Sequence, residues 1–308
     1  MKQVQVLLST YNGEHYISEQ LQSILRQSYP NISILARDDG STDCTTVFLR
    51  EYSEENPNRI TVLTGSNIGV VPSFFELVMH SDPQADYYCF CDQDDVWLEQ
   101  KIERAVNMLD SKSDKIPAMV FTATKLVDKE LHSFGTWPKA PSKQPSFYNA
   151  LIQNIAVGAT ITINRAARDL FVNGYRVDPS RIIMHDWWFY LLVSAFGNVI
   201  YDQRPSMLYR QHGNNVVGGS NSFFDKLNQK YRSYLKHKGK HLLVSQAREF
   251  YRVYGHLLDD EKREQLELFI APRQRFREKI HFLQRSKLYR QSILEQSLFR
   301  FLILAGYI

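Results

Sequence analysis

Acidic and hydroxyl side chains follow three apolar runs of this sequence, at the point where each run ends. Residues 9–14 (Ser-Thr-Tyr-Asn-Gly-Glu) follow the run 4–8, residues 38–43 (Asp-Asp-Gly-Ser-Thr-Asp) follow 32–36, and residues 92–97 (Asp-Gln-Asp-Asp-Val-Trp) follow 87–91. In an open parallel sheet, ligands bind beyond the carboxyl ends of the strands. If the runs are parallel strands, the three segments therefore share one ligand site.

Asp92 and Asp94 are the best candidates for metal ligands. Alternate residues at the end of a strand project to the same side, so their carboxylates would lie next to each other. Paired carboxylates suit an oxygen-seeking cation such as Mg²⁺ or Mn²⁺, which usually also binds ligand phosphates. Helix capping is the alternative for Asp43 and Asp95. The full set of acids expected at this edge is Glu14, Asp38, Asp39, Asp43, Asp92, Asp94 and Asp95.

Glycine-rich phosphate loops are missing from the sequence. A dinucleotide-binding fold would carry Gly-x-Gly-x-x-Gly after its first strand, whereas residues 10–14 read Thr-Tyr-Asn-Gly-Glu. The Walker pattern Gly-x-x-x-x-Gly-Lys is also missing. We therefore expect a phosphate ligand to be bound by a metal ion and side chains.

Strand and helix patterns alternate in the first half of the chain. Short apolar runs at 4–8, 32–36, 60–63 and 87–91 alternate with helix-spaced segments at 14–27, 43–55, 71–80 and 98–109. Further strands are expected at 118–125, 159–164, 199–201 and 207–211, and a helix at 187–195. This alternation predicts an α/β fold with a largely parallel sheet flanked by helices.

Composition limits the class of protein. The chain has 308 residues, of which 44% are hydrophobic and 23% are charged, so intrinsic disorder is excluded. Three cysteines, two of them in the apolar run 87–91, indicate free thiols in a reducing compartment. An apolar segment of the kind found in signal peptides is not expected near the amino end, and nowhere are there about 18 consecutive apolar residues for a membrane span.

Charge divides the chain into an acidic amino part and a basic carboxyl part. Residues 223–308 contain 18 Lys and Arg against 9 Asp and Glu, whereas residues 1–222 contain 19 against 24. We place a boundary at residue 219, between a catalytic domain (1–219) and a basic helical region (220–308). Six basic residues and four aromatic residues between 223 and 240 favour docking on anionic lipid. A solvated helix face or a contact in a homo-oligomer is the alternative, and no nucleic-acid motif is present.

The motifs together resemble a known family. Residues 9–13, 38–43, 67–69 and 92–97 have the order and spacing of family-2 glycosyltransferases, which have the GT-A fold. Residues 185–188 (His-Asp-Trp-Trp) and 209–215 (Tyr-Arg-Gln-His-Gly-Asn-Asn) resemble the bacterial rhamnosyltransferase branch. The resemblance covers about residues 3–218. It implies a nucleoside-diphosphate sugar as donor.

The resemblance also implies roles for individual residues. Asp39 would accept a hydrogen bond from the pyrimidine N3–H, Asp38 would support it, and Asp92 and Asp94 match the metal-binding Asp-x-Asp of the family. The residues assigned to the nucleotide sugar are Thr10, Tyr11, Glu14, Asp38, Asp39, Asn67, Gly69, Asp92, Gln93 and Arg210. Ordinary turns at residues 10–11 and 67–69 are the alternative.

Residues 185–188 are expected to contribute the catalytic base. Asp186 matches the family's catalytic carboxylate, and burial among aromatic residues would raise its pKa. Capping the following helix is an alternative role that is compatible with catalysis. Trp187 and Trp188 are candidates for stacking on acceptor sugars, or for core packing. His212 is a candidate third metal ligand, with a purely structural role as the alternative.

The expected protein is an inverting, metal-dependent glycosyltransferase with Asp186 as base and Mg²⁺ or Mn²⁺ at Asp92 and Asp94. The resemblance implies dTDP-β-L-rhamnose as donor and a lipid-linked saccharide of a surface polysaccharide as acceptor. We expect a cytoplasmic protein, peripheral on the inner face of the cell membrane. A transferase for UDP-hexoses or UDP-N-acetylhexosamines is an alternative. A catalytically silent membrane-docking subunit is another.

Overall fold

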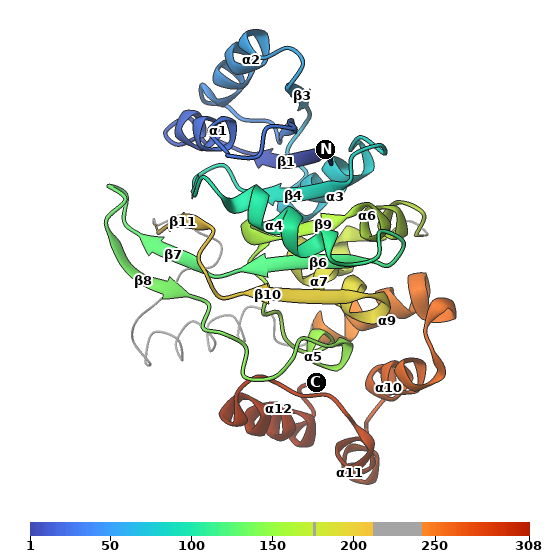
Figure 1. Cartoon of the computed structure of the whole chain (residues 1–308). Helices are drawn as coiled ribbons and strands as arrows, with labels where there is room; N and C mark the ends of the chain where they lie inside the picture. Colours follow the sequence, from blue (N-terminus) through green and yellow to red (C-terminus); the bar gives the residue numbers. More distant parts are fainter. Residues whose placement is uncertain (175–176, 212–241) are drawn as a thin grey trace.

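A seven-stranded sheet forms the centre of the protein in the computed structural model, which describes residues 1–174, 177–211 and 242–308 (Figure 1). The strand order is β10-β6-β9-β4-β1-β2-β3. Every pair is parallel except those formed by β9, which runs antiparallel to both neighbours. The strands are β1 (Val4–Thr10), β2 (Ile32–Asp38), β3 (Ile60–Thr64), β4 (Tyr87–Cys91), β6 (Ala118–Thr122), β9 (Thr162–Asn164) and β10 (Asn198–Asp202). The predicted, largely parallel α/β sheet is confirmed.

Helices cover both faces of this sheet, which is why its central strands are largely apolar. Val6 and Leu8 of β1 pack with α1 (Ile17–Leu25), α2 (Thr45–Glu55) and α4 (Lys101–Asp110). Leu7, between them in sequence, belongs to the core on the opposite face. Helices α3 (Val70–Met79), α6 (Arg165–Val172) and α7 (His185–Phe196) contribute to that second core. The result is a three-layer arrangement with a helical layer on each side of the sheet.

A second sheet of four strands stands beside the carboxyl edge of the first, in the order β5-β11-β7-β8. Its strands are β5 (Val96–Trp97), β7 (Thr124–Val127), β8 (Ser133–Trp137) and β11 (Met207–Arg210). The strand predicted at 118–125 is divided between the two sheets. Ala123 lies at the division, where its N–H still bonds to Asp202 of β10 before the chain turns to pair with β8 and β11. The strand predicted at 159–164 likewise consists of a 3₁₀ turn (Gly158–Thr160) followed by β9.

Helices dominate the remaining described residues. They are α5 (Phe147–Ala150), α9 (Leu242–Tyr254), α10 (Asp260–Ile270), α11 (Phe276–Arg285) and α12 (Ile293–Ala305), with short 3₁₀ turns at Pro179–Arg181 and Gly255–Leu257. The apolar face of α9 shares a core with α7, because Phe250 and Tyr254 contact Trp188 at ring-centroid distances of 5.5 and 6.2 Å. The helical region therefore packs on the catalytic part rather than standing apart. The boundary proposed at residue 219 lies outside the described residues, as do the basic and aromatic residues between 223 and 240.

Candidate active site

The pairing of β1 with its two neighbours brings the three predicted segments together. Leu8 pairs with Cys91 of β4, and Thr10 pairs with Asp38 of β2. The residues that follow these strands therefore leave the sheet at the same edge. The predicted convergence of segments 9–14, 38–43 and 92–97 is confirmed.

Asp38 shapes the turn after β2. Its carboxylate accepts hydrogen bonds from the backbone N–H groups of Gly40 and Ser41 at 3.1 and 2.8 Å, and from the hydroxyl groups of Thr10 and Ser41 at 3.1 and 2.6 Å. Gly40 adopts a positive φ of 79°, which glycine reaches without steric strain. Asp38 therefore holds Thr10 and the turn in place, and its support of a contact between Asp39 and the base remains a prediction.

Asp39 joins the turn after β2 to the turn that precedes α3. It accepts hydrogen bonds from the backbone N–H groups of Ile68 and Gly69, both at 2.9 Å, and forms an ion pair with Arg37 at 2.5 Å. Asn67 is exposed beside this turn. The structure therefore places Asp39 with residues 67–69, as the nucleotide-pocket assignment requires. Arg37 was not singled out from the sequence, because it lies inside an otherwise apolar strand.

Glu14 and Asp43 bind backbone N–H groups near the start of α2. The carboxylate of Asp43 accepts from the N–H groups of Thr45 and Glu14 at 3.0 and 3.1 Å, and the carboxylate of Glu14 accepts from the N–H of Cys44 at 2.9 Å. Asp43 therefore satisfies backbone donors at the helix start, close to the capping role expected of it. The predicted contact of Glu14 with the nucleotide remains a prediction.

Gln93 fastens the loop after β1 to the loop after β4. Its side-chain amide accepts from the Tyr11 N–H at 2.7 Å and donates to the Tyr11 carbonyl at 2.9 Å. A Cβ atom on Gly13 would lie 2.3 Å from the Gln93 carbonyl oxygen, so a larger residue there would displace the Gln93 amide. The ring of Tyr11 is 46% exposed and remains open to a ligand. The sequence assigned Gln93 to the donor without showing this clamp.

The acids after β4 repel one another. Burial raises the pKa of Asp92 to about 7, with further contributions from the negative charges of Asp94 and Asp186. Burial also raises the pKa of Asp95 well above its usual range, and one of its carboxylate oxygens has no hydrogen-bond partner among the described residues. The capping alternative for Asp95 is wrong, because α4 begins only at Lys101. A set of partly buried, mutually repelling oxygen ligands fits a divalent cation.

Arg210 supports this acidic segment from behind. Its backbone N–H donates to Asp95 at 3.1 Å, and its side chain donates to the carbonyl oxygens of Asp94 and Lys129 and to the carboxylate of Glu19. The side chain is 3% exposed. We therefore correct its predicted role, because a guanidinium directed at these partners positions the segment rather than the diphosphate.

Lys101 is a buried cation that the sequence analysis missed. Its ammonium donates to the carbonyl of Ala159 at 2.8 Å and lies 4.4 Å from the centre of the Trp97 ring. Burial lowers its pKa to about 8, against the attraction of neighbouring groups that include Asp95. Its charge also acts on Asp92. The signal in the sequence was a lysine on the buried face of α4, beside Ile102.

Asp186 lies in the first turn of α7, near the acids that follow β4. Burial raises its pKa to about 6, against hydrogen bonds from the Trp187 and Gly158 backbone and the Asn154 side chain. The raised pKa expected from its aromatic surroundings is confirmed. The capping alternative is wrong, since the helix is preceded by Met184 as its N-cap residue.

His185, before Asp186, packs in the core rather than facing the acids. Its ring stacks on Phe74 at 3.8 Å, and burial lowers its pKa to about 3, so it stays neutral. A Cβ atom on Gly158 would lie 3.0 Å from its Nε2 atom. Because Gly158 has no side chain, the segment 157–158 can approach both His185 and Asp186.

The two tryptophans after Asp186 have different surroundings. Trp187 is partly exposed, and its indole N–H donates to the carbonyl of Ala150 at 2.6 Å. Trp188 is fully buried against α9. The acceptor-stacking role predicted for Trp188 is therefore wrong, because successive helical residues point about 100° apart and only one of the two faces the site.

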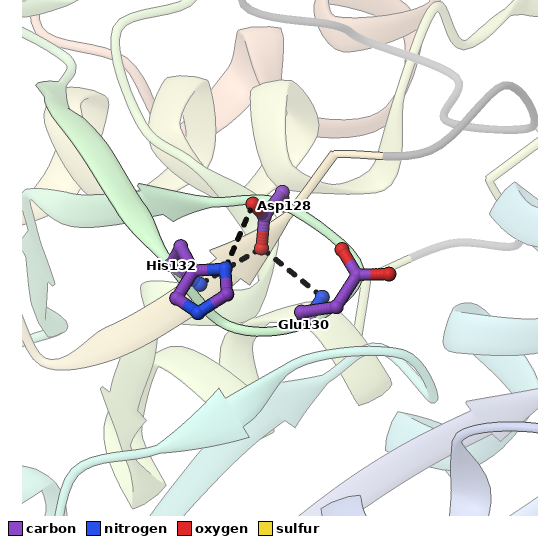
Figure 2. A group of neighbouring side chains, drawn as sticks. All are labelled: Asp128, Glu130 and His132. Carbon is purple, nitrogen blue, oxygen red and sulfur yellow. Dashed lines mark hydrogen bonds and ion pairs between the residues drawn. The ribbon is translucent and has the colours of Figure 1, made fainter.

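A group of three other side chains lies on the turn between β7 and β8. In the part of the chain that the structure describes, Asp128, Glu130 and His132 are the one set whose possible metal-ligating atoms all lie within 4.8 Å of one another (Figure 2). Asp128 accepts from the backbone N–H groups of His132 and Glu130 at 2.8 and 3.0 Å, so turn formation explains the cluster. Asp92 and Asp94 supply only two ligands. His212, the predicted third, lies outside the described residues.

The sheet order and the helices on both of its faces agree with the GT-A fold, and Asp92 and Asp94 follow β4 at the edge where such folds bind ligands. Residues 5–171 match the family described as Glycosyl transferase family 2. The chain belongs to this family. It is 32% identical over 229 residues to the dTDP-rhamnosyl transferase RfbG of Shigella flexneri, covering 70% of this chain and 75% of RfbG.

A second relative acts on a different donor. The UDP-Glc:alpha-D-GlcNAc-diphosphoundecaprenol beta-1,3-glucosyltransferase WfgD of Escherichia coli is 26% identical over 170 residues, or 54% of this chain and 62% of WfgD. Solved structures share the fold. TarS 1-349 of S. aureus in complex with UDP superposes with a TM-score of 0.58 at 17% identity, over 88% of this chain and 70% of TarS. The mannosyltransferase PcManGT of Pyrobaculum calidifontis, in complex with GDP-Man and Mn2+, gives a TM-score of 0.51 at 15% identity, over 92% and 84%.

Proposed function

We propose that the protein is a metal-dependent, inverting glycosyltransferase that moves L-rhamnose from dTDP-β-L-rhamnose to a lipid-linked saccharide. The observation that carries the transferase part of this proposal is that Asp94 and Asp186 both lie near enough to Asp92 for their charges to raise its pKa. A diphosphate-binding pair and a separate buried carboxylate are the two groups that single displacement at an anomeric carbon requires.

Asp92 and Asp94 are the residues that would hold the cation, together with the diphosphate of the donor. They fit it because their oxygens are hard ligands and their charges repel without a counterion. A bound Mg²⁺ or Mn²⁺ supplies charge neutralisation for the departing diphosphate. Arg210 and Gln93 keep the segment in place through the contacts described above.

Asp186 is the proposed general base. With a pKa of about 6 it is mostly ionised at pH 7, yet basic enough to take a proton from an acceptor hydroxyl. The acceptor oxygen bonds to the anomeric carbon, the bond from that carbon to the diphosphate oxygen breaks, and the proton passes to Asp186. Attack opposite the leaving group inverts the anomeric centre, so a β-linked donor yields an α-rhamnosyl product. Trp187, the residue after Asp186, is partly exposed and offers its ring to the acceptor sugar.

The rhamnosyl assignment rests on the similarity to RfbG and on the motif resemblance. Thymine is a pyrimidine with an N3–H, the donor that Asp39 is predicted to accept beside the turn 67–69. The similarity to WfgD favours a second candidate, transfer of glucose from UDP-glucose to a diphosphoundecaprenol-linked sugar.

Donor hydrolysis separates the two candidates. The purified chain with Mn²⁺ is incubated with dTDP-β-L-rhamnose, UDP-glucose, UDP-galactose or UDP-N-acetylglucosamine, and the released nucleotide is quantified. The proposal expects the highest kcat/KM with dTDP-rhamnose, and no release above background from Asp186→Asn or Asp94→Asn. A higher kcat/KM with a UDP-sugar would refute the rhamnosyl assignment. If no donor is hydrolysed, the assignment as a transferase is refuted.

A further inference from the structure

One face of helix α12 is apolar and open to solvent. Ile293, Leu294, Leu298 and Phe301 are 85%, 67%, 47% and 62% exposed. At about 100° per residue, these positions fall within an arc of about 140°. Ser297 and Ala305 share the arc, so it carries no charged side chain. The opposite side of the helix is anchored in the core by Phe299 and Ile303.

The segment that contains α11 and α12 is strongly basic. Residues 271–308 contain eight Lys and Arg against two Asp and Glu, a net charge of +6. Arg277 and Arg300 are exposed, and neither has an ion-pair partner among the described residues. An exposed apolar helix face in a cationic segment combines the two features with which peripheral helices bind anionic lipid.

Hydrogen bonds connect this helix to the catalytic site. Gln153 donates to Glu295 of α12 at 2.8 Å and accepts from the backbone N–H of Gln291 at 2.8 Å. The next residue, Asn154, donates from its side chain to Asp186. Adjacent residues of one loop therefore contact the start of α12 and the proposed base. In Figure 1, α12 lies at the opposite end of the protein from α2, on the side of α5 and its following loop.

We propose that Ile293, Leu294, Leu298 and Phe301 form a docking surface that inserts into an anionic lipid bilayer. Docking through this face places the membrane next to the loop 151–158. A saccharide carried on a membrane lipid then reaches Asp186 without leaving the bilayer surface. This last consequence rests on the proposed function, whereas the docking surface itself does not. The basic residues between 223 and 240, predicted from the sequence to bind lipid, are a different segment.

Vesicle flotation tests the surface with the full chain and needs neither donor nor acceptor. Wild type is mixed with vesicles of phosphatidylglycerol and phosphatidylcholine, or of phosphatidylcholine alone, in low salt. We expect flotation with the anionic vesicles, and a partition coefficient lower by about tenfold or more for Leu294→Asp/Phe301→Asp. Val47→Asp is the matched control, since Val47 is 50% exposed on the distant helix α2, and it should float like wild type.

A second variant keeps the test independent of folding defects. Arg277→Gln/Arg300→Gln leaves the apolar face intact, and each lost charge should weaken binding to anionic vesicles by about fivefold. All variants should hydrolyse the donor at the wild-type rate, because none of these residues lies at the catalytic site. If wild type hydrolyses no donor, the proposed function is refuted, whereas the docking result does not depend on it.

Three outcomes overturn the proposal. Wild type does not float with anionic vesicles, or Leu294→Asp/Phe301→Asp floats as well as wild type. In the third, wild type does not bind vesicles but forms a dimer by light scattering, and Leu294→Asp/Phe301→Asp is a monomer. This result would assign the face to a contact with a second copy of the chain.

Discussion

Replacing Asp186 by asparagine separates the catalytic role of this carboxylate from its effect on stability. Asparagine has nearly the same shape and keeps an oxygen that accepts from the Trp187 N–H, a hydrogen bond of 2.6 Å in the wild type. It cannot take a proton from an acceptor hydroxyl. Loss of a general base lowers rates by about 10²–10⁴-fold. We therefore expect kcat to fall by that factor, with little change in the KM for the donor.

The same substitution has a predictable effect on folding. Burial raises the pKa of Asp186 from 3.8 to about 6, so the native state disfavours the ionised form. The folded pKa lies above the unfolded value, so this group lowers the free energy of unfolding as pH rises from about 4 to 6. The two units correspond to about 3 kcal/mol at pH 7. Asp186→Asn should be more stable than wild type at pH 7 in EDTA, by at most that amount, and the difference should vanish at pH 4.

Two measurements check these expectations. Initial rates across pH 5–9 should show an acid limb near pH 6 in wild type that is missing from Asp186→Asn, and urea unfolding at pH 4 and 7 gives the stability difference. A variant that transfers sugar within threefold of wild type, with the same pH profile, would show that Asp186 is not the base. A variant that is unfolded at pH 7 would contradict the predicted sign of the stability change.

Other predictions concern the metal site and its supports. Because the pKa of Asp92 is raised to about 7, protons compete with the cation, and Mn²⁺ affinity measured by calorimetry should fall about tenfold per pH unit below 7; equal affinity at pH 5.5 and 7.5 contradicts this. Gly13→Ala places a Cβ atom 2.3 Å from the Gln93 amide oxygen and should raise the KM for the donor about tenfold, whereas an unchanged KM would mean that the clamp is dispensable. Because burial lowers the pKa of Lys101 from 10.5 to about 8, the folded state disfavours its charged form, and Lys101→Met should raise the free energy of unfolding at pH 6 by about 3 kcal/mol, with a smaller gain at pH 9; urea denaturation that shows a loss at pH 6 contradicts this.

The strands that build the site could be predicted because each is a short, β-branched or aromatic run that ends in polar residues. β4 has the predicted bounds, and β1 and β2 extend two residues further, into the site itself. The second sheet could not be predicted in the same way. β5 has only two residues, β8 is largely exposed, and the run 118–127 contains no glycine or proline to mark the point where the chain passes from one sheet to the other.

The acids of the site could be placed from the sequence, but the cations could not. Strand ends and the Asp-x-Asp spacing indicated Asp92 and Asp94, and the family resemblance indicated Asp186. The role of Arg210 depends on Glu19, which is 191 residues away in the chain and gives no local signal. A lysine in a helix is usually exposed, and only the packing of α4 shows that the Lys101 side chain is buried. The roles of Arg210 and Lys101 thus depend on tertiary contacts between distant segments, which local sequence patterns do not show.

The central claim is that a divalent cation at Asp92 and Asp94 binds the diphosphate of the donor. Calorimetric titration of dTDP, with Mn²⁺ or with EDTA, measures this without any turnover. We expect Mn²⁺ to tighten dTDP binding by at least about a hundredfold in wild type and in Asp128→Asn, the control from the exposed cluster, and by less than threefold in Asp94→Asn. Equal dTDP affinity with Mn²⁺ and with EDTA in wild type would contradict the account.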